Sequence, residues 1–214
     1  MAEIDWAEAR RYLGYKPGNP PSPQIEEILR DCGLELMNAA RPKAVWKRFP
    51  LTVQKDGALE LAGMEISSCD LAVHLNGCRE AVLLGATLGV ETDRLIRKAE
   101  IGEISRAVML QACAASLLES WCDQWCDEIA GQVSPLLLRP RFSPGYGDFS
   151  VSHQIGMLSA LEAGKRIGLS ATDGMMLTPV KSVTAVVGLT DQPGSCHTRG
   201  CAACGKTDCL FRKV

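Results

Sequence analysis

The sequence predicts an α+β fold, with helices packed around a twisted, mainly antiparallel sheet. Apolar and polar residues alternate over 44–49 and 51–61 around a Lys55-Asp56-Gly57 turn, which predicts a pair of antiparallel strands. Apolar residues recur at helical spacing over 22–37 and 94–127. Because strands and helices do not alternate regularly along the chain, the mixed class is favoured over a parallel sheet with crossover helices.

Length and charge exclude several classes of partner. The 214 residues carry a net charge of −2 and no cluster of Lys and Arg, so nucleic acid is not an expected partner. No apolar run approaches the length of a membrane span, and the N-terminus lacks a basic segment followed by an apolar one. We therefore expect no membrane association and a cytoplasmic protein, with one domain over 1–192 and a cysteine-rich tail over 193–214.

Two helices are predicted near the N-terminus. The first runs from Asp5 to Leu13, and Asp5 fits its N-cap or first turn, where the helix dipole stabilises an acid. Ser22 and Pro23 start the second helix, since serine caps well and proline fits the first helical position. The apolar positions of this second helix share one face: Ile25, Ile28, Leu29, Cys32, Leu36 and Met37.

The middle of the chain supplies a buried strand and a long helix. The apolar run 81–89, ended by glycine, predicts the strand. The helical sequence, interrupted at Gly102, continues to Asp127 and is too apolar for a solvated helix. Glu119 lies within this apolar stretch. It either occupies an exposed position between buried stripes, or it faces a cation or hydrogen-bond donors.

The stretch from Arg141 to Asp148 is too rich in Gly and Pro for a helix or a strand. Pro144 and Gly145 predict a turn, and glycine lets the main chain approach a ligand closely. Arg141 offers a planar fork of donors suited to a carboxylate or phosphate, and Tyr146 offers a ring with a polar tip. The alternative is that Arg141 pairs with a surface acid and that the turn has no further role.

After this loop, Ser150 or Ser152 is expected to cap a helix that extends to 164–166. His153, in its first turn, is expected to be solvated, and the earlier His74 is expected to pack on a helix. The β-branched run 183–187 then predicts a further strand of the sheet.

The ten cysteines fall into two groups. Six lie among apolar residues and are expected in the core of a protein from a reducing compartment: Cys32, Cys69, Cys78, Cys113, Cys122 and Cys126. The other four, Cys196, Cys201, Cys204 and Cys209, lie within fourteen residues and form a candidate metal site, for which zinc or an iron–sulfur cluster would both be suitable. The alternatives are reactive tail thiols or a Cys201–Cys204 dithiol.

Several motifs resemble the activation (reactivation) domain of cobalamin-dependent methionine synthase. The most specific is Arg-x-x-Pro-Gly-Tyr over 141–146. Ile-Asp-Trp at 4–6, Leu-Glu-Ser-Trp at 118–121 and the strand that begins near Pro179 add support. The sequence departs from the family at 147–150, where Gly-Asp-Phe-Ser replaces the Pro-Ala-Cys-Pro of the large enzymes, which leaves the contacts beyond Tyr146 open. The cysteine tail looks like the tails of stand-alone activation proteins.

The resemblance implies an S-adenosylmethionine site. Its expected members are Asp5, Glu119, Arg141, Ser143, Gly145, Tyr146, Val187 and Gly188. Arg141 should bind the ligand carboxylate. Asp5 or Glu119 should pair electrostatically with the positive groups of the ligand. Main-chain groups of Val187 and Gly188 would meet the adenosyl moiety, without the aromatic residues that the large enzymes carry there.

The resemblance also implies a function. The chain would be a stand-alone activation subunit, a component of a methyltransferase rather than a complete enzyme. It would support reductive remethylation of the cobalamin held by a methionine synthase subunit, and a flavodoxin- or ferredoxin-type reductant is a candidate further partner. The alternative is a redox or metal-cluster protein that reductively reactivates another corrinoid methyltransferase.

Overall fold

The computed structural model describes residues 2–16, 18–54 and 58–192. The predicted turn at 55–57 and the predicted metal ligands of the tail lie outside these ranges. The elements, in chain order, are α1 (Trp6–Tyr12), α2 (Pro23–Ala39), β1 (Lys43–Val53), β2 (Ala58–Leu61), β3 (Met64–Ser67), α3 (Cys69–His74), β4 (Glu80–Thr87), α4 (Val90–Gly102), α5 (Ile104–Val133), β5 (Leu137–Leu138), α6 (His153–Leu161), α7 (Ala163–Ile167), β6 (Ser170–Ala171), β7 (Leu177–Thr178) and β8 (Ser182–Thr190).

The main sheet has six strands in the order β3-β2-β1-β4-β8-β5, and every neighbouring pair is antiparallel. The predicted α+β class is therefore confirmed. The predicted segment 44–49 and the first residues of the second one, 51–53, form one continuous strand, β1, and residues 58–61 form β2. Residues 43–50 pair with β4 and residues 51–53 pair with β2, so proline, which lacks an N–H, lies where the strand changes partner.

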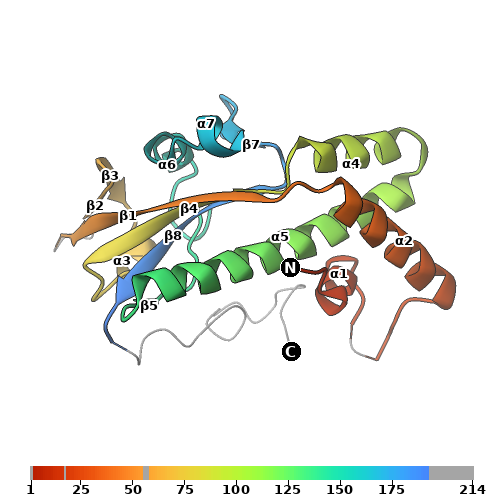
Figure 1. The fold of residues 1–214 in the computed structure, drawn as a ribbon, viewed down its shortest axis with the longest axis horizontal. Helices are drawn as coiled ribbons and strands as arrows, with labels where there is room; N and C mark the ends of the chain where they lie inside the picture. Colours follow the sequence, from red (N-terminus) through yellow and green to blue (C-terminus); the bar gives the residue numbers. More distant parts are fainter. Residues whose placement is uncertain (1, 17, 55–57, 193–214) are drawn as a thin grey trace.

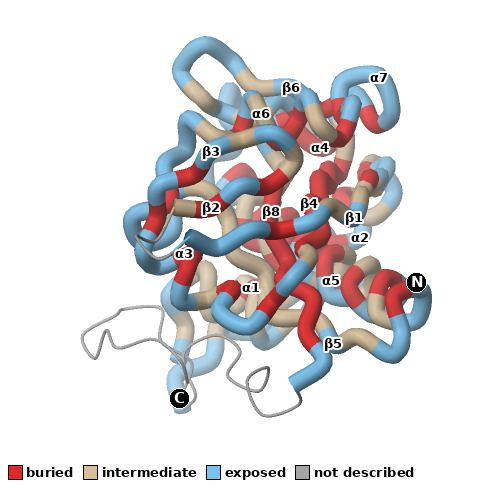
Figure 2. The backbone as a smooth tube through the Cα atoms, turned by 90° about the vertical axis from the view of Figure 1, so that its left-hand side faces the viewer, coloured by how far each residue is buried: buried red, intermediate tan, exposed pale blue. Residues whose placement is uncertain are grey.

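Helices cover both faces of the sheet (Figure 1). α3, α6 and α7 contribute to a hydrophobic cluster on one face, which includes Leu83, Met157 and Leu161. α2, α4 and α5 contribute to a second cluster on the other face, and α5 also packs against α1. Side chains alternate along a strand, so Leu83 faces the first cluster while Val82 and Leu84 face the side of α5. Figure 2 shows buried backbone concentrated in the central strands and along α5.

The two longest predicted features are confirmed with sharper bounds. The apolar run 81–89 contains β4, in which every residue after Glu80 is buried. The interruption at Gly102 is the end of α4, and α5 then continues for 30 residues. Its buried residues follow a helical stripe, as the apolar spacing predicted. Among the described residues, none of the helices combines the length and apolar character that crossing a bilayer requires.

The short elements were not predicted. α3, β3, β5, β6 and β7 have two to six residues each, too few to show a period in the sequence. Ser152 is the N-cap residue of α6, as one of the two predicted alternatives, but its side chain makes no hydrogen bond to the helix. Its Oγ lies 2.9 Å from Ser150 Oγ instead. Five of the six predicted core cysteines are buried, but Cys69, in the first turn of α3, is exposed.

Candidate functional site

The loop after β5 contains the turn that the sequence predicted. The Tyr146 N–H donates to the Ser143 carbonyl at 3.1 Å, and Gly145 has a φ of +95°. A positive φ at the third position is what a type II turn with proline at the second position requires. The start of the loop is fixed to β8, because Phe142 and Val186 exchange two main-chain hydrogen bonds of 2.9 and 2.8 Å. The loop is therefore an extension of the sheet edge with a defined shape.

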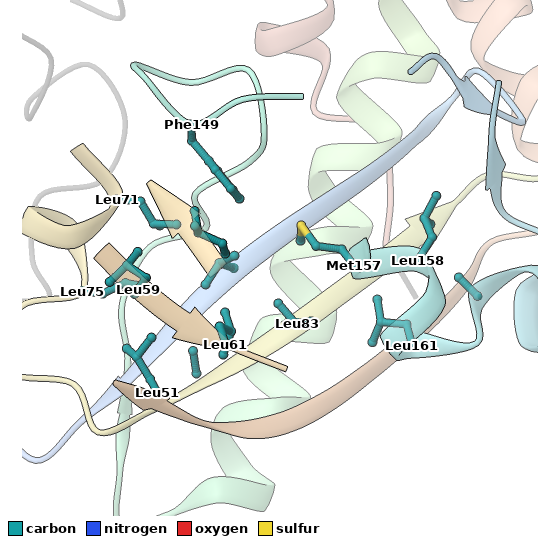
Figure 3. Close-up of a cluster of buried hydrophobic side chains, with 14 of the residues drawn as sticks. Leu51, Leu59, Leu61, Leu71, Leu75, Leu83, Phe149, Met157, Leu158 and Leu161 are labelled. Carbon is teal, nitrogen blue, oxygen red and sulfur yellow. The ribbon is translucent and has the colours of Figure 1, made fainter. Parts of the chain in front are cut away.

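One aromatic side chain anchors the far end of this loop in the core. Phe149 is 1% exposed and belongs to the cluster on the α6 side of the sheet. Figure 3 shows it reaching from the loop toward that cluster, where Leu71 and Met157 also lie. The ring of His153 stacks on Phe149 with centroids 5.5 Å apart, so His153 is not the freely solvated side chain that was expected.

His74 supports the same loop from the other side. It is the last residue of α3, and its Nε2 lies 2.8 Å from the Pro140 carbonyl. Its ring also packs against Phe142 with centroids 5.1 Å apart. Burial lowers the pKa of His74, so the neutral ring that donates to this carbonyl is favoured at neutral pH.

The departure from the family pattern at 147–150 is explained by a contact with α3. The Asp148 carboxylate accepts hydrogen bonds from Ser68 Oγ, from the Cys69 N–H at 2.7 Å and from the Asp70 N–H at 3.1 Å. In return the Asp148 N–H donates to Asp70 Oδ2 at 3.1 Å. Gly147, with a φ of +52°, lies so close to Asp70 that an added Cβ would be 2.0 Å from Oδ2. Gly147 and Asp148 thus dock the loop on the N-terminus of α3.

We expect this docking to depend on pH and on Asp148. The hydrogen bond from Ser68, followed by those from the main chain, holds the Asp148 pKa below its ordinary value of 3.8. A depressed carboxyl pKa stabilises the folded loop above the ordinary value, and this contribution is lost as the pH falls through the lowered pKa. Hydrogen exchange of the amides of residues 69, 70 and 145 should therefore be well protected from pH 7 to 5.

The variant Asp148→Asn should reduce this protection over the whole range from pH 7 to 5, because the amide cannot accept three hydrogen bonds as an ionised carboxylate does. The matched control is Asp173→Asn, which removes another exposed carboxylate far along the chain. Equal protection in Asp148→Asn and the control would contradict the role given to Asp148.

Arg141 lies at the start of the loop and binds two acids of α5. Its Nη2 donates to Glu119 Oε2 at 2.6 Å and its Nη1 donates to Asp123 Oδ1 at 2.7 Å. Nη1 also lies 3.7 Å from Cys126 Sγ. The Arg141 side chain is 18% exposed, against 48% for Glu119 and 59% for Asp123. Arg141 therefore pairs with surface acids, which was one of the two alternatives for this residue. Glu119 faces a cation, which was one of the two alternatives for Glu119.

The charges in this cluster influence their neighbours. Burial alone lowers the pKa of Arg141, but Cys122, Glu119, Cys126 and Asp123 outweigh it, so the guanidinium pKa is raised and the group is cationic. Burial raises the pKa of the Cys122 thiol to about 12, so this sulfur is a neutral neighbour at physiological pH. The cluster is therefore one half-buried cation held by two partly solvated carboxylates.

The charge of Glu119 influences two tyrosines, Tyr12 and Tyr146. Burial, followed by the charge of Glu8 and then of Glu119, raises the pKa of Tyr12 to about 12. Partial burial of the phenol, followed by the charge of Glu119, raises the pKa of Tyr146 on the loop. The charge of Glu119 thus acts on residues of both α1 and the loop. Both phenols are neutral hydrogen-bonding groups at neutral pH.

Asp5 reaches the same face of α5 through the main chain. Ser116, one helical turn before Glu119, donates to the Asp5 carbonyl at 2.8 Å. The Asp5 side chain caps α1, since its Oδ1 accepts from the Ala7 and Glu8 N–H groups at 2.9 and 3.1 Å. The expectation of an N-cap is confirmed. A contact between Asp5 and a ligand stays a prediction.

Val187 and Gly188 do not join the exposed cluster. Both are buried within β8, where Val187 is 0% exposed and pairs with Val82 of β4. The Gly188 carbonyl accepts from the Arg139 N–H at 2.8 Å, and an added Cβ would meet Cys78 Sγ and Leu75 Cδ2 at 2.7 Å. The close packing of Cys78 and Leu75 therefore leaves no room for a side chain at position 188. Ligand contacts from these two residues stay a prediction that nothing in the geometry favours.

The candidate site thus contains Glu119, Arg141, the Ser143–Tyr146 turn and, on the neighbouring helix α1, Asp5. Sequence reasoning did not assign three residues to the site. They are Asp123, which accepts the hydrogen bond from Arg141 Nη1, and Asp148 and Phe149, which anchor the loop. Asp123 could have been found from its spacing, because a residue four positions after Glu119 lies on the same helix face. Within the described ranges, no group of three or more His, Cys, Asp or Glu side chains is arranged to hold a metal ion.

Comparisons with known proteins identify a fold relationship. No protein-family model and no curated protein matches this sequence. Among solved structures, the chain is similar to the crystal structure of the MetH reactivation domain bound to AdoHcy, with a TM-score of 0.62 and 14% sequence identity. The alignment covers 92% of this chain and 75% of that chain. At this identity the likeness shows a shared fold.

Proposed function

We propose that this chain, which shares the fold of the MetH reactivation domain, binds S-adenosylmethionine at the Arg141 cluster and acts as a separate activation subunit of a cobalamin-dependent methionine synthase. The observation that carries the proposal is the pairing of Arg141 with Glu119 beside the Ser143–Tyr146 turn. The Arg-x-x-Pro-Gly-Tyr motif, the shared fold and the AdoHcy bound to the similar structure all support this assignment.

The charges of the cluster suit this ligand. S-adenosylmethionine carries a carboxylate, an ammonium and a sulfonium. Arg141 is buried enough for a charge-assisted pair with the carboxylate to be strong, and its planar fork allows two parallel hydrogen bonds. Glu119 supplies a partly exposed carboxylate that can pair with a positive group of the ligand, and Asp5 is held near the same face of α5 by its hydrogen bond with Ser116. The turn at Gly145 offers main-chain groups without a side chain in the way.

The role of the chain in the reaction is to bind and orient the donor. The cobalamin held by the partner subunit supplies the methyl acceptor, so no nucleophile is required from this chain. Holding the donor in one orientation lowers the entropic cost of the transfer. The exposed Tyr146 ring, at the tip of a loop anchored by Phe149 and Asp148, is the side chain we expect at the boundary between the ligand and the partner.

A calorimetric titration of the full chain with S-adenosylmethionine tests the proposal. We expect saturable binding with one ligand per chain. The same titration on a Cys201→Ser, Cys204→Ser variant should give the same affinity, because all the ligand-binding residues proposed at the cluster lie between Asp5 and Tyr146. If neither protein binds the compound while the wild type binds a cobalamin-loaded methyltransferase, the alternative of a redox or metal-cluster protein for another corrinoid enzyme takes its place.

A further inference from the structure

Two carboxylates hold one guanidinium in the candidate site, which leaves one surplus negative charge. Glu119 and Asp123 each accept a hydrogen bond from a different terminal nitrogen of Arg141, at 2.6 and 2.7 Å. Both acids are on the exposed side of α5, so they keep much of their hydration and their charge. A single carboxylate would neutralise the cation, and the second one requires a separate explanation.

The two carboxylates differ in what surrounds them. Glu119 carries a charge that raises the pKa of both Tyr12 and Tyr146, each of which is affected first by burial. Asp123 is one helical turn further along α5 and is the more exposed of the two, with 59% of its side chain accessible. Asp123 is therefore the carboxylate that can leave the Arg141 fork at the lower cost, since water can replace its partner.

A ligand α-carboxylate that binds both terminal nitrogens of Arg141 has to displace the acids bound there, and Asp123 at Nη1 is the one displaced at the lower cost. S-adenosylmethionine and its demethylated product AdoHcy present the same carboxylate and the same ammonium, so both meet this competition. They differ by the sulfonium charge. The methyl donor has a net positive charge and is attracted by the surplus carboxylate, whereas the zwitterionic product gains nothing from it.

We propose that Asp123 is a specificity-determining residue that favours S-adenosylmethionine over AdoHcy at this site, an inference that rests on the proposed function. It acts by competing with the carboxylate of either compound while attracting only the one that bears a sulfonium. Loss of that charge on methyl transfer then lets Asp123 return to Arg141, which speeds release of the product. The residue discriminates by charge, because the two compounds differ in shape by a single methyl group.

The test is to measure the dissociation constants of both compounds with the wild type and with Asp123→Asn, by calorimetry on the full chain. AdoHcy should bind about threefold more tightly to the variant and S-adenosylmethionine about equally, so their ratio should fall about threefold, the scale of one solvent-exposed ion pair. The matched control is Asp127→Asn, which removes an exposed carboxylate one turn further along α5. It should leave the ratio unchanged.

Ionic strength gives a second readout that a purely structural role would not change. The wild-type preference for the sulfonium compound should shrink as salt is added, and Asp123→Asn should show a weaker salt dependence. Wild-type binding with an unchanged ratio in Asp123→Asn would overturn the role of Asp123 and leave the proposed function intact. If neither compound binds to the wild type, both proposals are wrong.

Discussion

Replacing Arg141 by alanine should weaken S-adenosylmethionine binding about thirtyfold, or about 2 kcal/mol, the value expected when a charge-assisted pair to a carboxylate is left unmade. The variant removes the group that we propose binds the ligand carboxylate, and it leaves Glu119 and Asp123 without their shared partner. Calorimetric titration measures the loss directly. The affinity of Arg141→Lys for S-adenosylmethionine should lie between those of the wild type and Arg141→Ala. A lysine ammonium keeps the charge but cannot form two parallel hydrogen bonds.

The fold should tolerate this change. Glu119 and Asp123 are 48% and 59% exposed, so water can solvate both once the guanidinium is gone. A suitable control is Arg166→Ala, which breaks an ion pair with Glu162 at α7, on the opposite face of the sheet from α5 (Figure 1). The control should bind as the wild type does. Unchanged affinity in Arg141→Ala would remove this residue from the site.

Replacing Phe149 by alanine should lower the free energy of unfolding by about 3 kcal/mol, because truncating a buried aromatic side chain leaves a cavity that neighbouring residues fill only in part. Phe149 is 1% exposed, and Phe142 and His153 pack against its ring with centroids 6.3 and 5.5 Å away. Urea denaturation gives the change as a shift of the midpoint at constant slope.

The same variant should also weaken ligand binding, since Phe149 fixes the end of the loop whose start carries Arg141. The main-chain bond from the Gly145 N–H to the Phe149 carbonyl, at 2.7 Å, links this anchor directly to the turn. Phe149→Leu keeps most of the apolar volume and should lose less stability than alanine. A loss below about 1 kcal/mol in Phe149→Ala would mean that the side chain is not an anchor.

How far the sequence alone could predict this protein depended on the length of each pattern. The long helix, the central strand and the turn at Pro144 and Gly145 were predicted because each has a period or a backbone requirement that is local. The short elements α3 and β3 show no such period. Their positions are fixed by packing against the sheet and the loop.

In the candidate site, too, features that depend on neighbouring residues were predictable and long-range contacts were not. The sequence by itself determined the α+β class, the capping role of Asp5, and the presence of an arginine fork at the start of a rigid turn, because each follows from neighbouring residues. Only the tertiary structure decided that Arg141 binds both Glu119 and Asp123, and that Asp148 docks the loop on α3. These contacts join residues 18 to 80 positions apart in the sequence. No local pattern encodes such pairs, because they exist only once the sheet has brought its edge loop against both helices.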